Sequence, residues 1–376
     1  MNTNAQAPVA KTRAVMDSTA PSPPLPHPAL GPAAHRETSQ EPVKRQRIHA
    51  PVLALVLLAA LLLALFASLL IGARTIHPAV VFDALFHPDL NNGEHAVVAS
   101  RIPRTIAGLL IGAALGLAGA GMQGITRNPL ADPGILGVNA GAALAVVTGI
   151  HFFAVSTLNG YILFAFLGAA AASLIVYLVA SLGRDGATPL KLALAGAAMA
   201  AGLGSLTSAL LMIGNQAFDR FRFWQVGTLG AREVPEMLSV APFLLIGAIA
   251  ILLSARLFNA VALGDDSARG LGFKVGRGRA ISAAGVVLLC GAATALAGPI
   301  GFVGLIVPHA IRALSGGDYR WLLPLSMLAG PVLLLGADII GRVVAPPAEI
   351  QVGVMTAVVG APLFLWLLRR GKQVSL

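Results

Sequence analysis

The sequence has little charge, a single cysteine and few aromatic side chains. Of its 376 residues, 11% are charged and 56% are hydrophobic, whereas soluble domains carry about 25% charged residues. This scarcity of charge excludes a soluble globular protein. The lone Cys290 excludes an intrachain disulfide and a cysteine-based metal site. The chain also lacks the G-x-x-x-x-G-K-[ST] phosphate loop, so it cannot cradle ATP in the usual way.

The first 50 residues differ in composition from the rest. They contain eight prolines with scattered Ser, Thr, Gln and Ala, and such a segment cannot bury enough apolar surface to offset its ordering entropy. We therefore predict that residues 1–50 form a disordered, Pro-rich cytoplasmic tail. The apolar run that follows is too long for a signal-peptide core, so we expect it to be an uncleaved first span.

Residues 51–370 are predicted to form one all-α polytopic membrane domain with about ten transmembrane helices. The eighth span is short and contains Pro308, so it must bend or cross only in part. Nineteen of the 26 Lys and Arg residues fall on the side of the termini, which predicts that both termini are cytoplasmic, including the short tail 371–376. The expected spans lie at about 51–71, 103–124, 135–151, 157–182, 190–214, 236–259, 280–297, 302–314, 321–345 and 351–368.

Small residues recur at helical spacing in the second span. Gly108, Gly112 and Gly116 lie four positions apart, which predicts close packing of helix backbones in lipid. The segment GAALGLAG, beginning at Gly112, matches GAATALAG 179 residues later at six of eight positions, and at this offset Pro129 falls on Pro308. The two segments lie on oppositely oriented helices, so the match indicates either an inverted repeat or chance similarity in a Gly/Ala-rich chain.

A polar turn joins the second and third spans, in the segment MQGITRNPLADPGILGVNAGA. Pro129 stops the second span, and Asn128 suits the turn. Gln123 and Asn139 lie near this turn on apolar helices, where an amide is stable only if it meets a partner or a water-filled path. The segment is therefore either a capped helical hairpin or part of a translocation path.

Together with RIPRT before it, this segment closely resembles a known family. Later stretches add GPIGFVGLIVPHAIR, ADIIGR and the closing VGAPLFLWLLRR. In the order and spacing of these motifs over about residues 51–370, the chain resembles the FecCD-type permeases of ABC importers for iron-siderophore, haem and cobalamin complexes. The resemblance implies a type II ABC importer fold of ten helices per subunit, dimerised around a central path. The first 50 residues match nothing in the family pattern.

Residues 257–279 form the longest cytoplasmic connection inside the predicted membrane domain. Asp265 and Arg269 are spaced to pair on one face of a short helix, and Gly264, Gly270 and Gly272 favour two short helices over one long one. From the residues alone this could be a charged loop that anchors helix ends on lipid phosphates. The resemblance implies instead a coupling loop that enters a cleft of a partner ATPase. The residues assigned to this coupling are Leu263, Gly264, Asp265, Asp266, Ala268, Arg269, Leu271 and Gly272.

Three arginines are expected near the outer surface. Arg101 and Arg104 open the second span three positions apart, and Arg342 lies near the outer end of the ninth. Their positions alone fit snorkelling to lipid headgroups. The resemblance implies that they form salt bridges with glutamates on the two lobes of a substrate-binding protein, contacts that mainly set docking speed and register.

Asp338 is the only carboxylate placed deep in a predicted span. It precedes Arg342 by one helical turn, which favours an intrahelical ion pair. A proton relay would need further ionisable groups, and His309 is the only nearby candidate by sequence. His309 follows Pro308 in a Pro-broken helix and is expected to bond a freed carbonyl; Gln123, Asn128, Pro129, Asn139, Pro308 and His309 are the candidates for the translocation path or gate.

These features favour a membrane-spanning permease subunit of an ATP-driven importer that moves an iron(III)-siderophore complex across a bacterial cytoplasmic (inner) membrane. Haem or cobalamin cargo, a secondary transporter driven by an ion gradient, and a non-transporting anchor or receptor remain as alternatives. The chain itself is expected to be no enzyme and to bind no cofactor or metal, because ATP and Mg²⁺ belong to the partner and the iron arrives already coordinated. The expected partners are two ATPase subunits, a second permease (identical or related), a periplasmic or lipoprotein binding protein, the iron-siderophore cargo and membrane lipid, with no nucleic acid.

Overall fold

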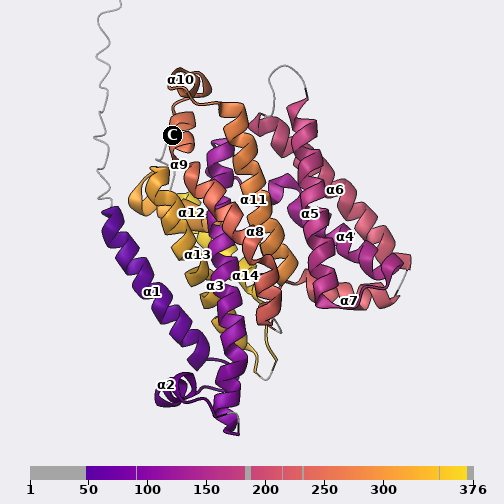
Figure 1. The fold of residues 1–376 in the computed structure, drawn as a ribbon, viewed down its shortest axis with the longest axis vertical. Helices are drawn as coiled ribbons and strands as arrows, with labels where there is room; N and C mark the ends of the chain where they lie inside the picture. The colour runs from indigo at the N-terminus through magenta and orange to yellow at the C-terminus, as the bar shows by residue number, and fades with distance from the viewer. Residues whose placement is uncertain are drawn as a thin grey trace, which may run out of the picture. The chain divides into compact units, whose positions relative to one another are not determined.

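A computed structural model describes residues 48–89, 91–182, 188–213, 215–230, 233–346 and 348–370. The predicted tail 1–50 lies outside these residues up to position 47, and so does the tail 371–376. The described chain is helical, and its helices belong to one compact unit. The elements are α1 (Ala50–Leu70), α2 (Pro78–Phe86), α3 (Gly93–Thr126), the 3₁₀ helix η1 (Pro133–Leu136), α4 (Val138–Phe153), α5 (Leu158–Ser181), α6 (Pro189–Ile213), α7 (Asn215–Gln225), α8 (Val234–Leu253), α9 (Ala255–Ala262), α10 (Asp265–Gly270), α11 (Val275–Ala297), α12 (Val303–Ser315), α13 (Tyr319–Val344) and α14 (Val352–Arg370) (Figure 1).

The prediction of an all-α protein with about ten spans is confirmed. Within the described residues, seven helices are long and apolar enough to cross a membrane, and α4, α12 and most of α14 are shorter apolar helices. Each of these ten helices falls on one of the predicted ranges. At 13 residues, α12 is about 20 Å long, which is less than the hydrocarbon core of about 30 Å, so it crosses only in part.

Helix α3 runs through the middle of the bundle and packs along α13, α11 and α12 (Figure 1). Its glycine stripe lies against α13: a Cβ atom at Gly112 would lie 2.5 Å from the Pro331 Cα, and one at Gly116 would lie 2.4 Å from the Ser326 carbonyl oxygen. The close packing predicted from the spacing of these glycines is therefore present, and the neighbouring atoms are backbone atoms that cannot rotate away.

We expect Gly112→Ala to destabilise the protein by about 1–3 kcal/mol, because the added methyl group forces α3 and α13 apart. Gly202→Ala on α6 is the matched control, since a Cβ there meets nothing within 4 Å. Midpoints of thermal unfolding in detergent compare the two. Equal midpoints would mean that the stripe does not set the α3–α13 distance.

Helix α3 begins ten residues before its predicted start. Pro103, at the predicted start, lies inside the helix. Asn92 caps the helix instead, accepting a hydrogen bond from the Glu94 N–H. The extra turns are held by packing: Val98 lies in an apolar cluster with Ile76 and Val81 of the α2 region. Hydropathy could not reveal these turns because they contain Glu94, His95 and Ser100 between the apolar positions.

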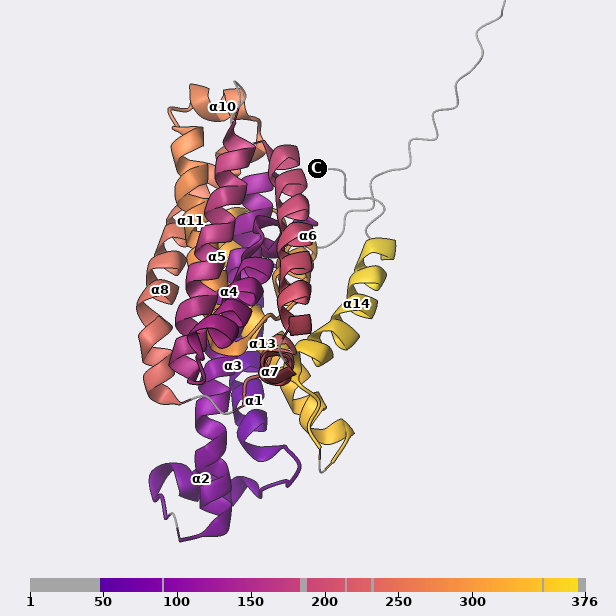
Figure 2. The same ribbon diagram turned by 90° about the vertical axis from the view of Figure 1, so that its right-hand side faces the viewer.

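Helix α2 and helix α10 lie at opposite ends of the bundle (Figure 1 and Figure 2). The start of α1 lies at the α10 end, because the Ile48 N–H donates to the Leu314 carbonyl at the end of α12. Helices α3 and α11 run in opposite directions, as an inverted repeat requires. Pro129 follows α3 in a turn, however, whereas Pro308 lies inside α12, so the repeat stays a prediction.

Candidate functional site

A buried charge cluster joins α3 and α13 near the α2 end. The Arg104 guanidinium donates from Nε and Nη2 to Asp338 at 3.1 and 2.9 Å, and from Nη1 to Glu349 at 2.6 Å. Asp338 is 1% exposed. The expected ion pair within α13 is also present, with Arg342 Nε 3.1 Å from Asp338 Oδ2. The partner on α3 could not be predicted, because it lies 234 residues away in the sequence.

Arg342 reaches further, to α1. Its Nη1 donates to the Ser68 carbonyl at 2.9 Å and its Nη2 to the Ser68 hydroxyl at 3.1 Å. That hydroxyl lies 2.8 Å from the Thr105 hydroxyl of α3. Through these contacts Arg342 of α13 links α1 and α3. It is 1% exposed, so it presents almost no surface. An unpaired charge would be costly at this depth, and Asp338 neutralises it.

Arg101 closes the end of α1. It donates to the carbonyl oxygens of Leu69 and Leu70 at 2.7 and 3.0 Å, and to that of Arg74. Leu69 and Leu70 lie in the last turn of α1, whose carbonyl oxygens have no partner within the helix. The Leu70 carbonyl also accepts the Ile76 N–H at 3.0 Å. Arg101 therefore acts in this structure as a C-terminal cap supplied by a neighbouring helix.

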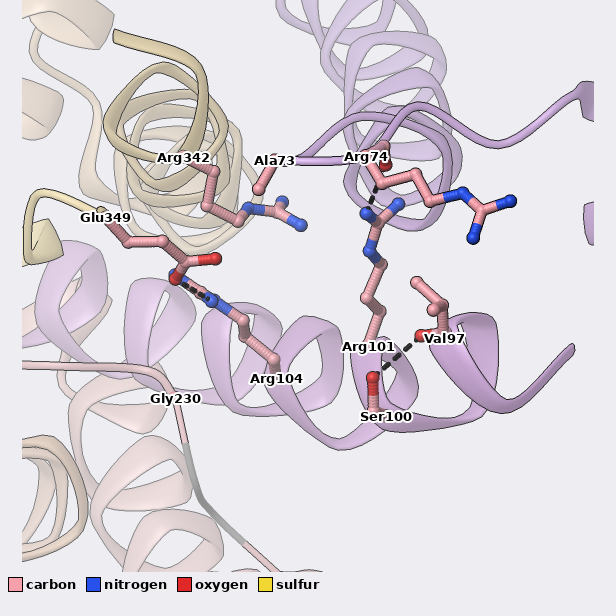
Figure 3. Close-up of a pocket in the computed structure, with 9 residues that line it drawn as sticks. All are labelled: Ala73, Arg74, Val97, Ser100, Arg101, Arg104, Gly230, Arg342 and Glu349. Carbon is pink, nitrogen blue, oxygen red and sulfur yellow. Dashed lines mark hydrogen bonds and ion pairs between the residues drawn. The ribbon is translucent and has the colours of Figure 1, made fainter. Parts of the chain in front are cut away.

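A pocket of about 320 Å³ opens beside these arginines. Arg74, Arg101, Arg104, Arg342 and Glu349 line it (Figure 3). Of its charged residues, Arg74 and Glu349 are the exposed ones, with side chains 64% and 38% accessible, whereas the Arg104 side chain is 15% accessible. The docking role predicted for Arg101, Arg104 and Arg342 stays a prediction. In this structure the donors of Arg101 and Arg342 face inward, and Arg74, which sequence reasoning missed, is the most exposed cation of the pocket.

The predicted coupling segment, residues 257–279, lies at the opposite end and covers most of α9, all of α10 and the first residues of α11. We call α9 and α10 the α9–α10 segment. Gly264 separates the two helices at φ +111°, and Gly272 follows α10 at φ +86°. Both φ angles favour glycine. The prediction of two short helices in this segment is confirmed by α9 and α10. Leu263 and Leu271 are 72% and 64% exposed, whereas Ala268 is buried in a small apolar cluster with Val275.

The predicted pair between Asp265 and Arg269 is wrong. Asp265 instead accepts two hydrogen bonds from Arg279 of α11, at 2.8 and 2.9 Å, and lies 3.6 Å from Arg127 at the end of α3. Arg269 pairs with Asp266 at 2.7 Å. The reason is that α10 is only six residues long, so Asp265 at its start faces α11, where the Arg279 side chain is 12% exposed and needs a carboxylate.

The candidate path residues are spread over three helix contacts. Gln123 is 1% exposed and donates to the Leu305 carbonyl of α12 at 3.3 Å, while Asn139 accepts from Thr294 of α11 at 3.1 Å. Asn128 accepts from the Leu130 N–H at 2.9 Å in the turn after α3. The buried Gln123 and the half-buried Asn139 thus both have partners within the chain, as the hairpin interpretation requires. Their role in translocation stays a prediction.

Pro308 is buried inside α12. His309 follows it, with its ring 6.1 Å from that of Phe364, and its buried Nδ1 has no hydrogen-bond partner among the described residues. The expectation that His309 bonds a freed carbonyl stays a prediction. Among the described residues, no group of three or more His, Cys, Asp or Glu is placed to hold a metal ion.

The helical bundle, with one charged cluster at each end, is that of a polytopic membrane permease. The chain belongs to the FecCD transport family, which it matches over residues 60–370.

Individual relatives share most of their length with it. The ferric enterobactin transport system permease protein FepD of Escherichia coli is 48% identical over 315 residues, covering 84% of this chain and 94% of that protein. The probable siderophore transport system permease protein YfiZ of Bacillus subtilis is 42% identical, covering 75% and 85%. A solved structure of a metal-chelate type ABC transporter in an inward-facing conformation has a TM-score of 0.74 at 29% identity, covering 85% of this chain and 99% of that one.

Proposed function

We propose that this chain is the membrane-spanning subunit of an ATP-driven importer that translocates an iron(III)-siderophore complex. The observation that carries this proposal is the match to the FecCD transport family over nearly the whole membrane domain. The siderophore is favoured because two relatives named for siderophore transport are 48% and 42% identical to this chain. A hemin transport permease of Yersinia pestis, at 37% identity, supports haem as the second candidate cargo.

The α9–α10 segment is the proposed contact with the ATPase. It presents Leu263 and Leu271 to solvent, and the Asp266 side chain is 98% exposed. An apolar ridge flanked by charge suits insertion into a cleft of a soluble partner. Two ATPase subunits, which hold the ATP and Mg²⁺, and a second permease copy or related chain complete the proposed assembly.

The arginine pocket is the proposed contact with a substrate-binding protein. Arg74 is 64% exposed and pairs with Glu94 at 2.9 Å, and Arg104 holds Glu349, whose side chain is 38% exposed. An incoming carboxylate could take the place of Glu349 on Arg104 without disturbing the buried Asp338. In this proposal Arg101 and Arg342 support the docking surface from beneath, by fixing the ends of α1, α3 and α13.

The proposed orientation places the α10 end in the cytoplasm and both termini with it. Basic residues concentrate there, in accord with the positive-inside rule. The described members of this set include Arg127, Lys191, Arg256, Arg269, Lys274, Arg277, Arg279, Arg312, Arg320 and Arg369. This orientation puts the arginine pocket outside, where a binding protein arrives.

Deletion of the chain, followed by growth on single purified iron sources, tests the proposed cargo. We expect growth to fail on one ferric siderophore and to persist on haem and on the other chelates, with restoration by a plasmid copy. Loss of growth on haem alone would assign the haem alternative. Unchanged growth on every iron chelate would contradict the proposal.

A further inference from the structure

Asn259 of α9 lies at the first turn of α13. Its Nδ2 donates to Asp318 Oδ1 at 2.6 Å, and its Oδ1 accepts the backbone N–H of Tyr319 at 2.9 Å. Asp318 is the N-terminal cap of α13 and also accepts the Arg320 N–H at 2.9 Å. The Asn259 side chain of α9 therefore completes the N-terminal cap of α13. It accepts the Tyr319 N–H, one of the backbone donors that have no partner within the helix at its start.

An amide is the side chain that suits this position. It donates from its nitrogen and accepts on its oxygen at the same time, which a carboxylate cannot do. The hydrogen bond from the Arg320 backbone, reinforced by the one from Asn259, lowers the pKa of the Asp318 carboxyl. Asp318 is thus an ionised acceptor, and its bond to Asn259 is charge-assisted.

Apolar contacts strengthen the same junction. Phe258 is 2% exposed, and its ring lies 5.3 Å from that of Tyr319. The Tyr319 hydroxyl accepts from Arg312 of α12 at 3.0 Å. On its other side, Phe258 lies against α3, where a Cβ at Gly124 would come within 2.7 Å of the Phe258 ring. The start of α13, the end of α12 and α9 are therefore packed as one body.

Helix α13 extends from this junction to the opposite end of the bundle. Its 26 residues span about 39 Å. Asp338 and Arg342, in its last two turns, are the residues bonded to Arg104 of α3 and Ser68 of α1. One helix is thus held at one end by the α9–α10 segment and at the other end by the buried charge cluster.

We infer that Asn259 is a positioning residue that ties the α9–α10 segment to α13, so that displacement of this segment moves α13 and the end of α12 with it. The inference rests on the proposed function, in which the ATPase contacts the α9–α10 segment. If Asn259 were only a helix cap, its loss would lower stability without changing how much iron is moved for each ATP hydrolysed.

The test uses the complete transporter, with ATPase and binding protein, in proteoliposomes. For Asn259→Ala we expect the ATPase to co-purify and to hydrolyse ATP as before, while ATP consumed per iron imported rises by about tenfold, a usual size for coupling between distant sites. Asn259→Asp should behave alike, because it lacks the donor and repels Asp318. The double variant Asn259→Ala/Asp318→Ala should be no worse than the poorer single variant, since both lose the same contact.

Asn92→Ala is the matched control. Asn92 caps α3 at the opposite end of the bundle through a bond to the Glu94 N–H, so this variant removes a similar cap and should leave the ATP-to-iron ratio unchanged. The role of Asn259 would be overturned if the ATP-to-iron ratio did not change in Asn259→Ala, or if it rose equally in Asn92→Ala. Uptake by the unaltered transporter would still require ATP in either case, so the proposed function would stand. ATP-independent uptake by the unaltered transporter would overturn the proposed function and this inference with it.

Discussion

Asp338→Asn should be the most destabilising single substitution at the arginine cluster, with an expected loss of about 3–5 kcal/mol, because it leaves the buried Arg342 without a carboxylate and leaves Arg104 with only the partly exposed Glu349. Asp338 is 1% exposed and pairs with both Arg104 and Arg342. Those two charges would repel each other across the α3–α13 contact once the carboxylate is gone. Thermal unfolding in detergent, read by the loss of helical circular dichroism, measures the change.

Glu349→Gln is the control for that substitution. It removes a second carboxylate from the same arginine, but the Glu349 side chain is 38% exposed, and exposed ion pairs contribute about 0–1 kcal/mol. If Asp338→Asn and Glu349→Gln unfold at the same temperature, Asp338 does not hold the cluster together. A double variant, Asp338→Asn with Arg342→Met, should recover part of the loss, since it removes one of the stranded charges.

Asp265→Arg should lower ATP-driven uptake by about tenfold or more, a usual size for coupling between distant sites, because it breaks the half-buried ion pair with Arg279. The reversed charge would face Arg279 and Arg127, and it would push the start of α10 away from α11 and α3. We expect ATPase binding to weaken in the same variant, because the α9–α10 segment would no longer be held in place. Uptake of the labelled ferric siderophore and co-purification of the ATPase are the two measurements.

The charge swap Asp265→Arg/Arg279→Asp is the control for this second substitution. Restoring one pair should return part of the uptake, and the recovery should be incomplete because Arg127 still repels the new arginine. Unchanged uptake in the single variant would mean that Asp265 does not position α10. A swap that restores nothing would mean that its pairing with Arg279 is not the reason for the loss.

The structure separates the two groups that a proton relay would need. Asp338 is bonded to Arg104, whereas His309 lies on α12 between Leu305 and Arg312, which both hydrogen-bond Gln123 of α3. Arg104 and Gln123 are 19 residues apart on one helix, which corresponds to about 29 Å. In the part of the chain that the structure describes, Asp338 and His309 are therefore too far apart to pass a proton directly, as the ion-gradient mechanism would require.

Much of the architecture could be predicted from the sequence because lipid imposes a simple rule. Spans must be apolar for about 20 residues, and the ten predicted ranges coincide with ten helices. Glycine spacing predicted that α3 packs closely against another helix, because only small residues permit that approach, but it did not say that the other helix is α13. Helices α2 and α7 were missed, since they are too short or too polar to read as spans.

The candidate sites could be predicted only where the partners are close in sequence. Asp338 and Arg342 lie four residues apart, and their pairing was expected. Arg104, which holds the same carboxylate, comes from a helix 234 residues away, and Asn259 lies 59 residues from Asp318. Pairings of this kind depend on how helices pack, and one sequence gives no signal for them. Asp265 was misassigned for the same reason, because its partner is on α11.

The central claim is that this chain is a permease subunit that transports only with a separate ATPase, and reconstitution tests it most directly. Purified chain alone, in proteoliposomes with a proton or sodium gradient and the ferric siderophore, should accumulate no iron. Adding the ATPase, the binding protein and ATP should produce uptake that stops when ATP is replaced by a non-hydrolysable analogue. Accumulation of iron by the chain alone, driven by either gradient, would contradict the account.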